Sequence, residues 1–539
     1  MVNPTYTISY DVGTTGVKTC LFAITDKIEL LAAASEGYNL YVLPGGGAEQ
    51  DPDEWWDAMI KSTNAVMKKS KIDKKDIGGI SFCSQMQGLV LVDKDGNAVR
   101  RAMSYMDQRA REELKKGIAY GPQIAGANIP KLLRALQITG AVACSVKDPV
   151  WKYKWVEAHE PEVFAKAYKW LDVKEYLICR MTGEFVMTQD SAFATLLYDI
   201  RKGKEGWSSE MCKLYGVQEK HLPKIVRCTD RVGKLRDKEA KELGLEPGTA
   251  VFGGGGDASL IGVGAGSVDF GDTHIYSGTS GWVSTVVDKS VVDTSAMIAA
   301  TVGAWEGHFN YFAELETAAK CVEWVKDHLA LDEIDIYLDK SHDLKHHRED
   351  RETVYTNLYD YMMAVVDTVP AGAGGVVFTP WLHGNRCPFE DPNARGMFFN
   401  ISLETGKSEM IRAVVEGVCF HLRWMLETEQ NKVKTSDMIR FVGGGALNDV
   451  TCQILADCTG KTIETVDSPQ NIGAVGAAAT VAVGTGLIHD LGEAKRLIPA
   501  AKTFYPRPEY KAIYDRNFRV YKNLYKANKE NFAILNADK

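Results

Sequence analysis

The sequence contains no apolar run of about 18 residues, the length that a membrane-spanning helix requires. Its first residues, MVNPTY, have neither the basic n-region nor the apolar h-region of a signal peptide. The 11 cysteines are odd in number and show no C-x-x-C spacing, which argues against a disulfide framework and favours a reducing compartment. We therefore expect a cytoplasmic protein with no membrane partner.

Excess positive charge is also missing, because the formal net charge is −8. This argues against a nucleic-acid or anionic-membrane partner that is recognised through bulk electrostatics. An acidic protein can still bind a nucleotide if backbone amides, a few cations and Mg²⁺ neutralise the phosphates. The chain has 539 residues, of which 45% are hydrophobic and 25% charged, so it is globular and too long for a single core.

The stretch DVGTTGVK lies between two strand-like runs and predicts a tight hairpin. Gly13 and Gly16 can adopt positive φ and let the backbone approach a ligand closely. Thr14 and Thr15 offer hydroxyl and amide donors to a phosphate. Asp11 stands at the strand end, where it can hold a hydrated divalent cation. An ordinary hairpin with a threonine-rich turn is the alternative interpretation.

Two later stretches repeat this arrangement. The strand-like run 273–277 ends in GTSG, residues 278–281, and a further strand follows. A third glycine-rich turn, GGGALN, follows the strand-like run 438–442. Three such turns, each directly after a strand, predict one nucleotide held between the two halves of a duplicated architecture.

A polar bend interrupts residues 79–93, which otherwise predict two strands. It contains Met86 and Gln87, and a side-chain amide at a strand end reads hydroxyl groups well. Asp107 and Arg109 follow in the stretch MDQRA. They are suited to polyol recognition, because a carboxylate accepts hydrogen bonds from hydroxyls and a guanidinium donates them. A surface salt bridge between the two is the alternative.

Asp257 is the outstanding carboxylate, because it follows four glycines at the seam between the predicted halves. Phosphoryl transfer to an alcohol needs a group that orients the hydroxyl and takes its proton, and a rigidly held carboxylate serves that purpose. An aspartate that caps a turn is the alternative. His342, His346 and His347 lack the cysteine and carboxylate pattern of a metal centre, so we expect none there.

Seven segments, in this order, resemble the FGGY carbohydrate kinases: DVGTTGVK, AEQDPDEWW, SQMQGLVLVD, GGGGDASLIGVGAG, YSGTSGWVS, RAVVEGVCFHLRWMLE and FVGGGALNDVTCQILAD. The resemblance covers nearly the whole chain. It implies an α/β fold of two actin-like ATPase (ribonuclease H-like) domains, with ATP and sugar in the cleft between them. We expect the N-terminal domain, with the sugar site and the first phosphate loop, to span residues 1–248. The C-terminal domain, with the catalytic aspartate at the seam, would span residues 249–539.

The resemblance also implies the residues of the site. Asp257 matches the catalytic base of the family, and Asp11 matches its Mg²⁺ contact. The residues implied for ATP are Asp11, Gly13, Thr14, Thr15, Lys18, Gly278, Thr279, Gly444, Gly445 and Asn448. Those implied for the sugar are Met86, Gln87, Asp107 and Asp257.

Within the family, SQMQGLVLVD most resembles the xylulokinases, but four positions depart from the usual pattern. Gln87 replaces a histidine that is usual in xylulokinases, and Ala258 stands where they typically carry asparagine and glycerol kinases glutamine. Asn385 and Asn471 stand where glutamate is common.

We expect ATP-dependent phosphorylation of a hydroxyl of a small sugar, with a pentulose of the xylulose or ribulose type as the first choice. A kinase of another polyol or signalling sugar (glycerol, erythritol or an autoinducer) is one alternative. A non-phosphorylating actin-like ATPase is the other. Dimers are common in the family, so a homodimer is expected by analogy.

Overall fold

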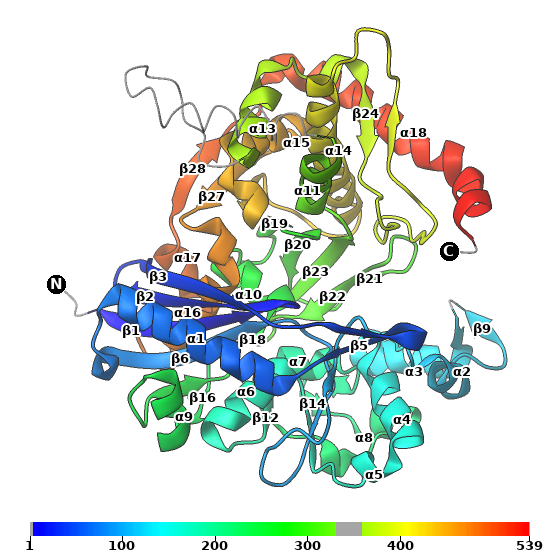
Figure 1. The fold of residues 1–539 in the computed structure, drawn as a ribbon. Coiled ribbons are helices and arrows are strands. Elements are labelled where there is room, and N and C mark those ends of the chain that lie inside the picture. Colours follow the sequence, from blue (N-terminus) through cyan, green and yellow to red (C-terminus); the bar gives the residue numbers. More distant parts are fainter. Residues whose placement is uncertain (1–3, 125, 330–357, 538–539) are drawn as a thin grey trace.

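The chain folds into two α/β halves, each built around one large sheet (Figure 1). The computed structural model describes residues 4–124, 126–329 and 358–537. The three histidines at 342, 346 and 347, where we expected no metal site, lie outside these residues. Among the described residues, no helix combines the length and the apolar character needed to cross a bilayer.

The first sheet has the strand order β16-β17-β6-β1-β2-β3, and β18 also pairs with β6. Strands β1, β2 and β3 form an antiparallel meander, whereas β6 runs parallel to β1. The bounds are β1 (Thr5–Val12), β2 (Gly16–Ile24), β3 (Ile28–Gly37), β6 (Ile77–Ser84), β16 (Arg231–Lys234), β17 (Ala250–Phe252) and β18 (Gly255–Gly256).

The second sheet has the order β21-β22-β23-β20-β19-β26-β27-β28. Here β19 and β20 form an antiparallel hairpin that continues into β23, and β26 runs parallel to β19. The bounds are β19 (Thr273–Ser277), β20 (Gly281–Val287), β21 (Val292–Asp293), β22 (Ile298–Val302), β23 (Phe309–Leu315), β26 (Met438–Val442), β27 (Thr462–Val466) and β28 (Ala500–Phe504).

The two sheets repeat one plan, in which a hairpin and a third antiparallel strand lie beside a later parallel strand. In the first half this set is β3-β2-β1-β6, and in the second it is β23-β20-β19-β26. The prediction of a duplicated architecture is therefore confirmed. The division after residue 248 stays a prediction, and two strands that follow it, β17 and β18, pair with β6 in the first sheet.

Helix α16 (Ile472–Gly484) comes from the C-terminal half of the chain but packs on the first sheet. Ser81 of β6 and Thr480 of α16 are hydrogen-bonded through their hydroxyls at 2.8 Å. Helix α10 (Asp257–Gly264) packs against α16 so closely that a Cβ at Gly264 would lie 2.1 Å from the Ile472 carbonyl oxygen. The run 472–483 is mostly Ala, Gly and Val, which predicts a tightly packed buried helix, and α16 confirms that prediction.

For helix α1 (Pro52–Ser70), the sequence DPDE predicts a start with Asp51 as N-cap, Pro52 at the first helical position and Glu54 closing a capping box. Asp51 is its N-cap and accepts a hydrogen bond from the Asp53 N–H, with Pro52 at the first position. The predicted capping box is wrong, because the Glu54 carboxylate instead accepts from Asn39 and from a neighbouring tyrosine.

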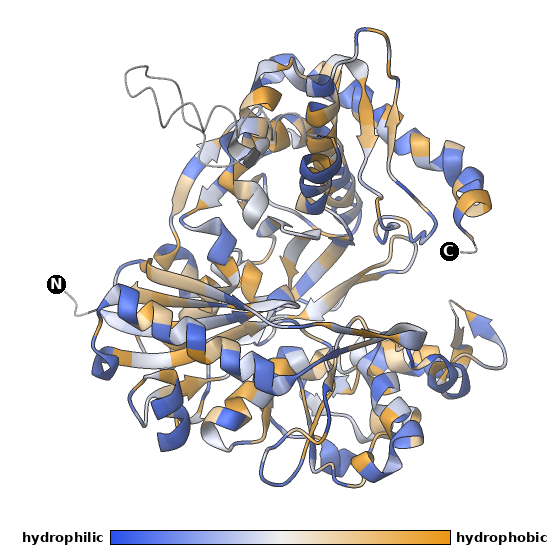
Figure 2. Ribbon diagram, viewed as in Figure 1, coloured by the Kyte–Doolittle hydropathy of each residue, from blue (hydrophilic) through white to orange (hydrophobic). Residues whose placement is uncertain are grey.

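The basic and aromatic composition of the tail from Ala501 predicts a packing arm, and the structure confirms it. Hydrophobic and hydrophilic residues are interspersed along helix α18 (Lys511–Asn536) (Figure 2), and on its apolar face Tyr514, Phe518 and Tyr521 are buried in the core of the second half. The other helices are α2 (Arg111–Gly117), α3 (Ile129–Thr139), α4 (Pro149–His159), α5 (Pro161–Phe164), α6 (Val173–Thr182), α7 (Gln189–Ala194), α8 (Ser209–Tyr215), α9 (Asp237–Leu243), α11 (Ala319–His328), α13 (Leu358–Thr368), α14 (Lys407–Gln430), α15 (Asp449–Thr459) and α17 (Ala494–Leu497).

Short strands complete the described fold. They are β4 (Tyr41–Leu43), β5 (Gly47–Gln50), β7 (Val90–Val92), β8 (Ala102–Met103), β9 (Gln123–Ile124), β10 (Ala127–Asn128), β11 (Lys169–Leu171), β12 (Val186–Thr188), β13 (Tyr198–Asp199), β14 (Gly206–Trp207), β15 (Lys224–Val226), β24 (Val377–Thr379) and β25 (Met397–Phe399). Most of them lie in the part of the first half that contains α2 to α8 (Figure 1).

Candidate active site

The turn between β1 and β2 is the predicted tight hairpin. Asp11 pairs with Lys18 across it, and the Gly13 N–H donates to the Gly16 carbonyl at 2.9 Å. The expectation of positive φ at these two glycines is wrong, since neither adopts the left-handed region. Glycine at position 16 is needed for another reason: a Cβ there would lie 2.9 Å from the carbonyl oxygen of Glu36 on β3.

The carbonyl groups of this turn are bound by the protein, but two of its amides are not. The Gln50 side chain donates to the Thr14 carbonyl at 2.6 Å, and the Tyr38 N–H donates to the Thr15 carbonyl at 3.0 Å. Within the described chain, the N–H groups of Thr14 and Thr15 donate to no protein acceptor. The turn therefore presents two free backbone donors, which is what a bound phosphate requires.

Asp11 is the penultimate residue of β1 and lies next to the beginning of α16. A Cβ at Gly473 would lie 3.2 Å from its Oδ2 atom, and Lys18 Nζ donates to the Gln470 carbonyl at 2.5 Å. Burial raises the pKa of Asp11, an effect that the Lys18 charge and a hydrogen bond with Cys83 oppose. The first hairpin is thereby joined to the C-terminal half of the chain.

Asp257 is the first residue of α10 and follows β18 directly. Its pKa is raised to about 7, chiefly by burial and in smaller part by the nearby carboxylates of Asp11 and Glu314, whereas a hydrogen bond from the Ala258 N–H opposes the rise. Two carboxylates from different strands thus lie within electrostatic range of Asp257. A carboxyl group with a pKa near neutral is suited to accept a proton at physiological pH.

The β19–β20 turn repeats the features of the first hairpin. The Gly278 N–H donates to the Ser280 carbonyl at 2.9 Å, and Ala318 and Ala319 donate to the carbonyls of Thr279 and Gly278. The Thr279 side chain is exposed, and its N–H has no protein acceptor in the described chain. This turn also presents a free amide and a free hydroxyl.

The third glycine-rich turn follows β26 and touches the second. Gly443 has φ of 92°, and a Cβ there would lie 2.6 Å from the Ser277 carbonyl oxygen. A Cβ at Gly445 would lie 2.7 Å from Ser277 Oγ, whereas Gly444 has open space around it. Asn448 caps α15 through Oδ1, which accepts from the Val450 N–H at 2.9 Å. Its Nδ2 group is therefore the part of the side chain left for a ligand.

The polar bend after β6 reaches the same place. Met86 packs on the backbone before Asp257, since a Cβ at Gly256 would lie 2.1 Å from Met86 Sδ. Gln87 has φ of 64°, a left-handed conformation that is rare for a residue with a side chain. The structure thus brings the predicted sugar-reading bend against the predicted catalytic residue.

Asp107 is less available than the other predicted residues. Its carboxylate is fully buried and accepts from the Ala48 N–H at 2.9 Å and from Arg109 Nη2 at 2.7 Å. The salt bridge with Arg109 is therefore present. A role of Asp107 in reading the sugar stays a prediction.

Sequence reasoning missed three contributors to the site. The Tyr105 hydroxyl lies 3.2 Å from Thr14 Oγ1, and the charges of Asp257 and Glu314 act on it. Glu314 on β23 forms an ion pair with Arg386 at 2.6 Å. Tyr105 directly precedes the stretch MDQRA, so its position in the sequence could have suggested a place in the site. The ion pair between Glu314 and Arg386 joins segments far apart in the sequence, so no local pattern could have indicated it.

Asp190 is a further residue that the sequence did not reveal. Its Oδ2 atom accepts from the Gly256 N–H at 2.7 Å and also from the Ser259 hydroxyl, so it grips both sides of Asp257. Helix α10 has no side-chain cap of its own. Burial alone would raise the pKa of Asp190, but Lys174 and the hydrogen bonds to the carboxylate lower it, which keeps Asp190 ionised.

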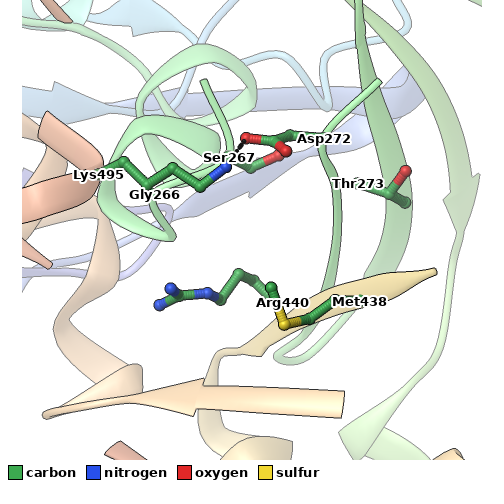
Figure 3. Close-up of a pocket in the computed structure, with 7 residues that line it drawn as sticks. All are labelled: Gly266, Ser267, Asp272, Thr273, Met438, Arg440 and Lys495. Atoms are coloured by element: carbon green, nitrogen blue, oxygen red, sulfur yellow. Dashed lines mark hydrogen bonds and ion pairs between the residues drawn. The ribbon is translucent and has the colours of Figure 1, made fainter. Parts of the chain in front are cut away.

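A small cavity lies away from this site (Figure 3). Thr273 and Met438, which begin β19 and β26, line it, whereas the glycine-rich turns follow the other ends of these strands. Lys495 Nζ and Asp272 Oδ2 meet at its edge at 2.8 Å. Its volume of about 20 Å³ suffices for a single water molecule, so it is not a nucleotide site.

Comparison with known families finds two matching models. The N-terminal domain of the FGGY family of carbohydrate kinases matches residues 6–264, and the C-terminal domain of that family matches residues 274–485. The xylulose kinase of Bacillus subtilis (strain 168) is 29% identical over 527 residues, which cover 97% of each chain. The gluconokinase of Bacillus licheniformis is 26% identical over 523 residues, 97% of this chain and 96% of that one.

Solved structures give the same result for the fold. The ligand-bound xylulose kinase from Lactobacillus acidophilus has a TM-score of 0.82 at 27% identity, covering 98% of this chain and 99% of that one. The gluconate kinase from Lactobacillus acidophilus has a TM-score of 0.81 at 27% identity, covering 99% and 100%. The predicted fold of two actin-like ATPase domains is confirmed.

Proposed function

The chain belongs to the FGGY family of carbohydrate kinases, and on that premise we propose that it transfers the γ-phosphoryl group of ATP to a hydroxyl of a pentulose of the xylulose type. The observation that carries the proposal is the position of Asp257. This carboxylate has a pKa of about 7 and lies beside Met86 of the polar bend and within electrostatic range of Asp11 of the first hairpin.

Asp257 acts as the base in this proposal. Its carboxylate takes the proton of the sugar hydroxyl while the hydroxyl oxygen bonds to the γ-phosphorus. The bond from that phosphorus to the β-phosphate oxygen breaks, and ADP leaves with its electron pair. Asp190 holds the turn in which Asp257 sits, so the base does not need to be repositioned for each turnover.

Backbone donors would bind the nucleotide. The free N–H groups of Thr14, Thr15 and Thr279 suit phosphate oxygens, and they come from both halves of the chain. The turn after β26 contacts Ser277, which directly precedes the turn that contains Thr279. A nucleotide with its phosphates at Thr279 would therefore have its adenosine near the turn after β26. The full set proposed for ATP is Asp11, Gly13, Thr14, Thr15, Lys18, Gly278, Thr279, Gly444, Gly445 and Asn448.

Asp11 is the residue that we propose holds Mg²⁺. This ion is commonly bound by one or two carboxylates together with substrate phosphates and water, so a larger ligand cluster is not needed. A cation beside Asp11 would also offset the burial that raises its pKa. When bound, Mg²⁺ neutralises charge on the transferring phosphates.

The charges around Asp257 favour a neutral sugar over a sugar acid. Asp11, Asp257 and Glu314 place three carboxylates within one electrostatic neighbourhood, and the nearby Arg386 is already paired with Glu314. A gluconate carboxylate would meet repulsion there, whereas the hydroxyls of xylulose would find acceptors. We propose Met86, Gln87, Asp107 and Asp257 as the sugar-binding residues.

A cytoplasmic location and a homodimer belong to the same proposal. The 11 cysteines are free, and all except Cys144 are buried, which suits a reducing compartment. The dimer rests on analogy with the family alone.

The decisive experiment measures ADP release with Mg-ATP against D- and L-xylulose, ribulose, glycerol, erythritol and gluconate. We expect one pentulose to stimulate ADP release. We expect Asp257→Asn to lower the kcat of this reaction by a factor of about 10² to 10⁴ and to leave the affinity for ATP unchanged. ATP hydrolysis that no sugar stimulates would favour the actin-like ATPase alternative. Near-normal turnover by Asp257→Asn would refute the role of this residue.

A further inference from the structure

The bend that carries Met86 and Gln87 is held by two buried charges. Lys152 Nζ donates to the Gln87 carbonyl at 2.8 Å, and Asp172 Oδ1 accepts from the Gly88 N–H at 2.9 Å. The Gln87 carbonyl and the Gly88 N–H belong to one peptide group. A cation and an anion therefore grip the two ends of the same peptide dipole, each in its favourable orientation.

The two charged residues come from separate helices and have few other partners. Lys152 lies on α4 and is fully buried, and the Gln87 carbonyl is the only acceptor of its ammonium group in the described chain. Asp172 is 3% exposed and is the N-cap of α6, where it also accepts from the Val173 N–H at 2.8 Å. The bend is thus tied to both helices.

The backbone of the bend requires such support. Gln87 adopts φ of 64°, which is strained for a residue with a Cβ atom and persists only where the surroundings enforce it. Gly88 fits for the opposite reason, because a Cβ there would lie 2.5 Å from Asp172 Oδ1. Only glycine lets the carboxylate come close enough to bind the N–H.

Burying these charges is costly, which makes a purely incidental contact a poor explanation. Burial lowers the pKa of Lys152 to about 8, although the carboxylates of Asp107, Asp172 and Asp148 oppose this shift. Burial, together with the charge of Glu175, raises the pKa of Asp172 to about 7. A water molecule or a neutral amide could satisfy a peptide group at lower cost.

We propose that Lys152 and Asp172 are positioning residues that fix the Gln87–Gly88 peptide and thereby aim the Met86 and Gln87 side chains at the sugar beside Asp257. This inference rests on the proposed sugar kinase function and deepens it. We call Lys152 and Asp172 together the clamp. The clamp sets the affinity for the sugar and not for the nucleotide, because it acts on the bend alone. Sugar recognition then depends on residues that need not touch the sugar.

Lys152→Met tests the clamp, with Lys154→Met as the matched control. Lys154 lies on the same helix, is partly exposed and contacts Gly216 and Glu157 instead of the bend. We expect Lys152→Met to raise the KM for the pentulose at least tenfold and to leave the KM for ATP within about threefold, whereas Lys154→Met changes neither. A merely structural loss would lower the active fraction without changing KM.

Gly88→Ala keeps the test informative if Lys152→Met does not fold. The added methyl group pushes Asp172 away from the Gly88 N–H while both charges stay in place. Folding of each variant is checked by its thermal unfolding curve, and the same split between the two KM values is expected. A folded Lys152→Met or Gly88→Ala enzyme with the wild-type sugar KM overturns the clamp.

Failure of the proposed function would look different. In that case the wild-type protein itself would show no ADP release that any sugar stimulates, whereas failure of the clamp alone leaves the wild-type activity intact. An equal rise in the KM for sugar and for ATP would also refute the clamp, since it would show that the two residues support the whole site.

Discussion

The two glycine-threonine hairpins of this protein have the same scaffold but different chemistry. In the first, the Gly13 N–H bonds to the Gly16 carbonyl, and in the second the Gly278 N–H bonds to the Ser280 carbonyl, so the second closing bond spans one residue fewer. In each sheet, a parallel strand lies beside the first strand of the hairpin: β6 beside β1, and β26 beside β19. The turns differ at the position two residues before the first glycine. That position is Asp11 in the first hairpin.

Tyr276 occupies this position in the second hairpin. Its ring stacks on Trp282 with the ring centroids 4.0 Å apart. Its pKa is raised, chiefly by burial and further by the charges of Asp11 and Asp257, so it lies close to both carboxylates. Equivalent positions of the duplicated fold thus have different roles: the first half supplies a carboxylate and the second supplies an aromatic ring.

The largest effect should come from exchanging the charge at this position. We expect Asp11→Asn to lower kcat by about 10²-fold or more, because a half-buried carboxylate that would hold Mg²⁺ is replaced by an amide of the same shape. Tyr276→Phe keeps the stacked ring and should stay within threefold of wild type. Steady-state kinetics at saturating Mg-ATP measures both. Equal losses in the two variants would contradict the division of roles.

The pH profile tests whether the first half also tunes the base. Asp257 has a raised pKa of about 7 and works in its ionised form, so kcat/KM should fall about tenfold per pH unit as the pH drops below 7. Removing the neighbouring negative charge in Asp11→Asn should lower the pKa of Asp257 and move this acid limb to lower pH. Tyr276→Phe is the control that should leave it in place. A limb near pH 4 in the wild type would refute the raised pKa.

A smaller effect is expected at the carboxylate that holds α10. Asp190→Asn should lower kcat about fivefold, since a charge-assisted hydrogen bond to the backbone before Asp257 becomes a neutral one worth about 1 kcal/mol less. The KM for ATP should change little. Asp199→Asn is the matched control, because Asp199 pairs with Arg201 and does not contact α10. Unchanged kcat in Asp190→Asn would show that α10 does not need this support.

The smallest effects should come from the two threonines that the hairpins share. We expect Thr14→Val and Thr279→Val each to raise the KM for ATP about threefold to tenfold, because each loses one hydroxyl donor and keeps its free N–H. Their effects should multiply in the double variant, since the two turns lie in different sheets. A threonine that affects kcat far more than KM would contradict a role in ground-state ATP binding.

Local patterns in the sequence were sufficient for the main features of the fold. Glycine between strand-like runs predicts the hairpins, and the small residues of 472–484 predict a helix that packs closely on its neighbours. A local prediction was wrong where a side chain expected to bond within its own segment instead bonds to residues of another segment. Glu54 was expected to bond within its own helix end, but the side chains of Asn39 and Tyr41 bind it.

What the sequence determined by itself is the duplicated α/β plan, the three glycine-rich turns and the aspartate at the seam. These follow from short stretches whose meaning depends only on neighbours along the chain. The tertiary structure decided the rest: the pKa of Asp257, the grip of Asp190, and the pairing of Lys152 and Asp172 around one peptide group. These depend on burial and on distances between side chains far apart in sequence, and both exist only once the chain has folded.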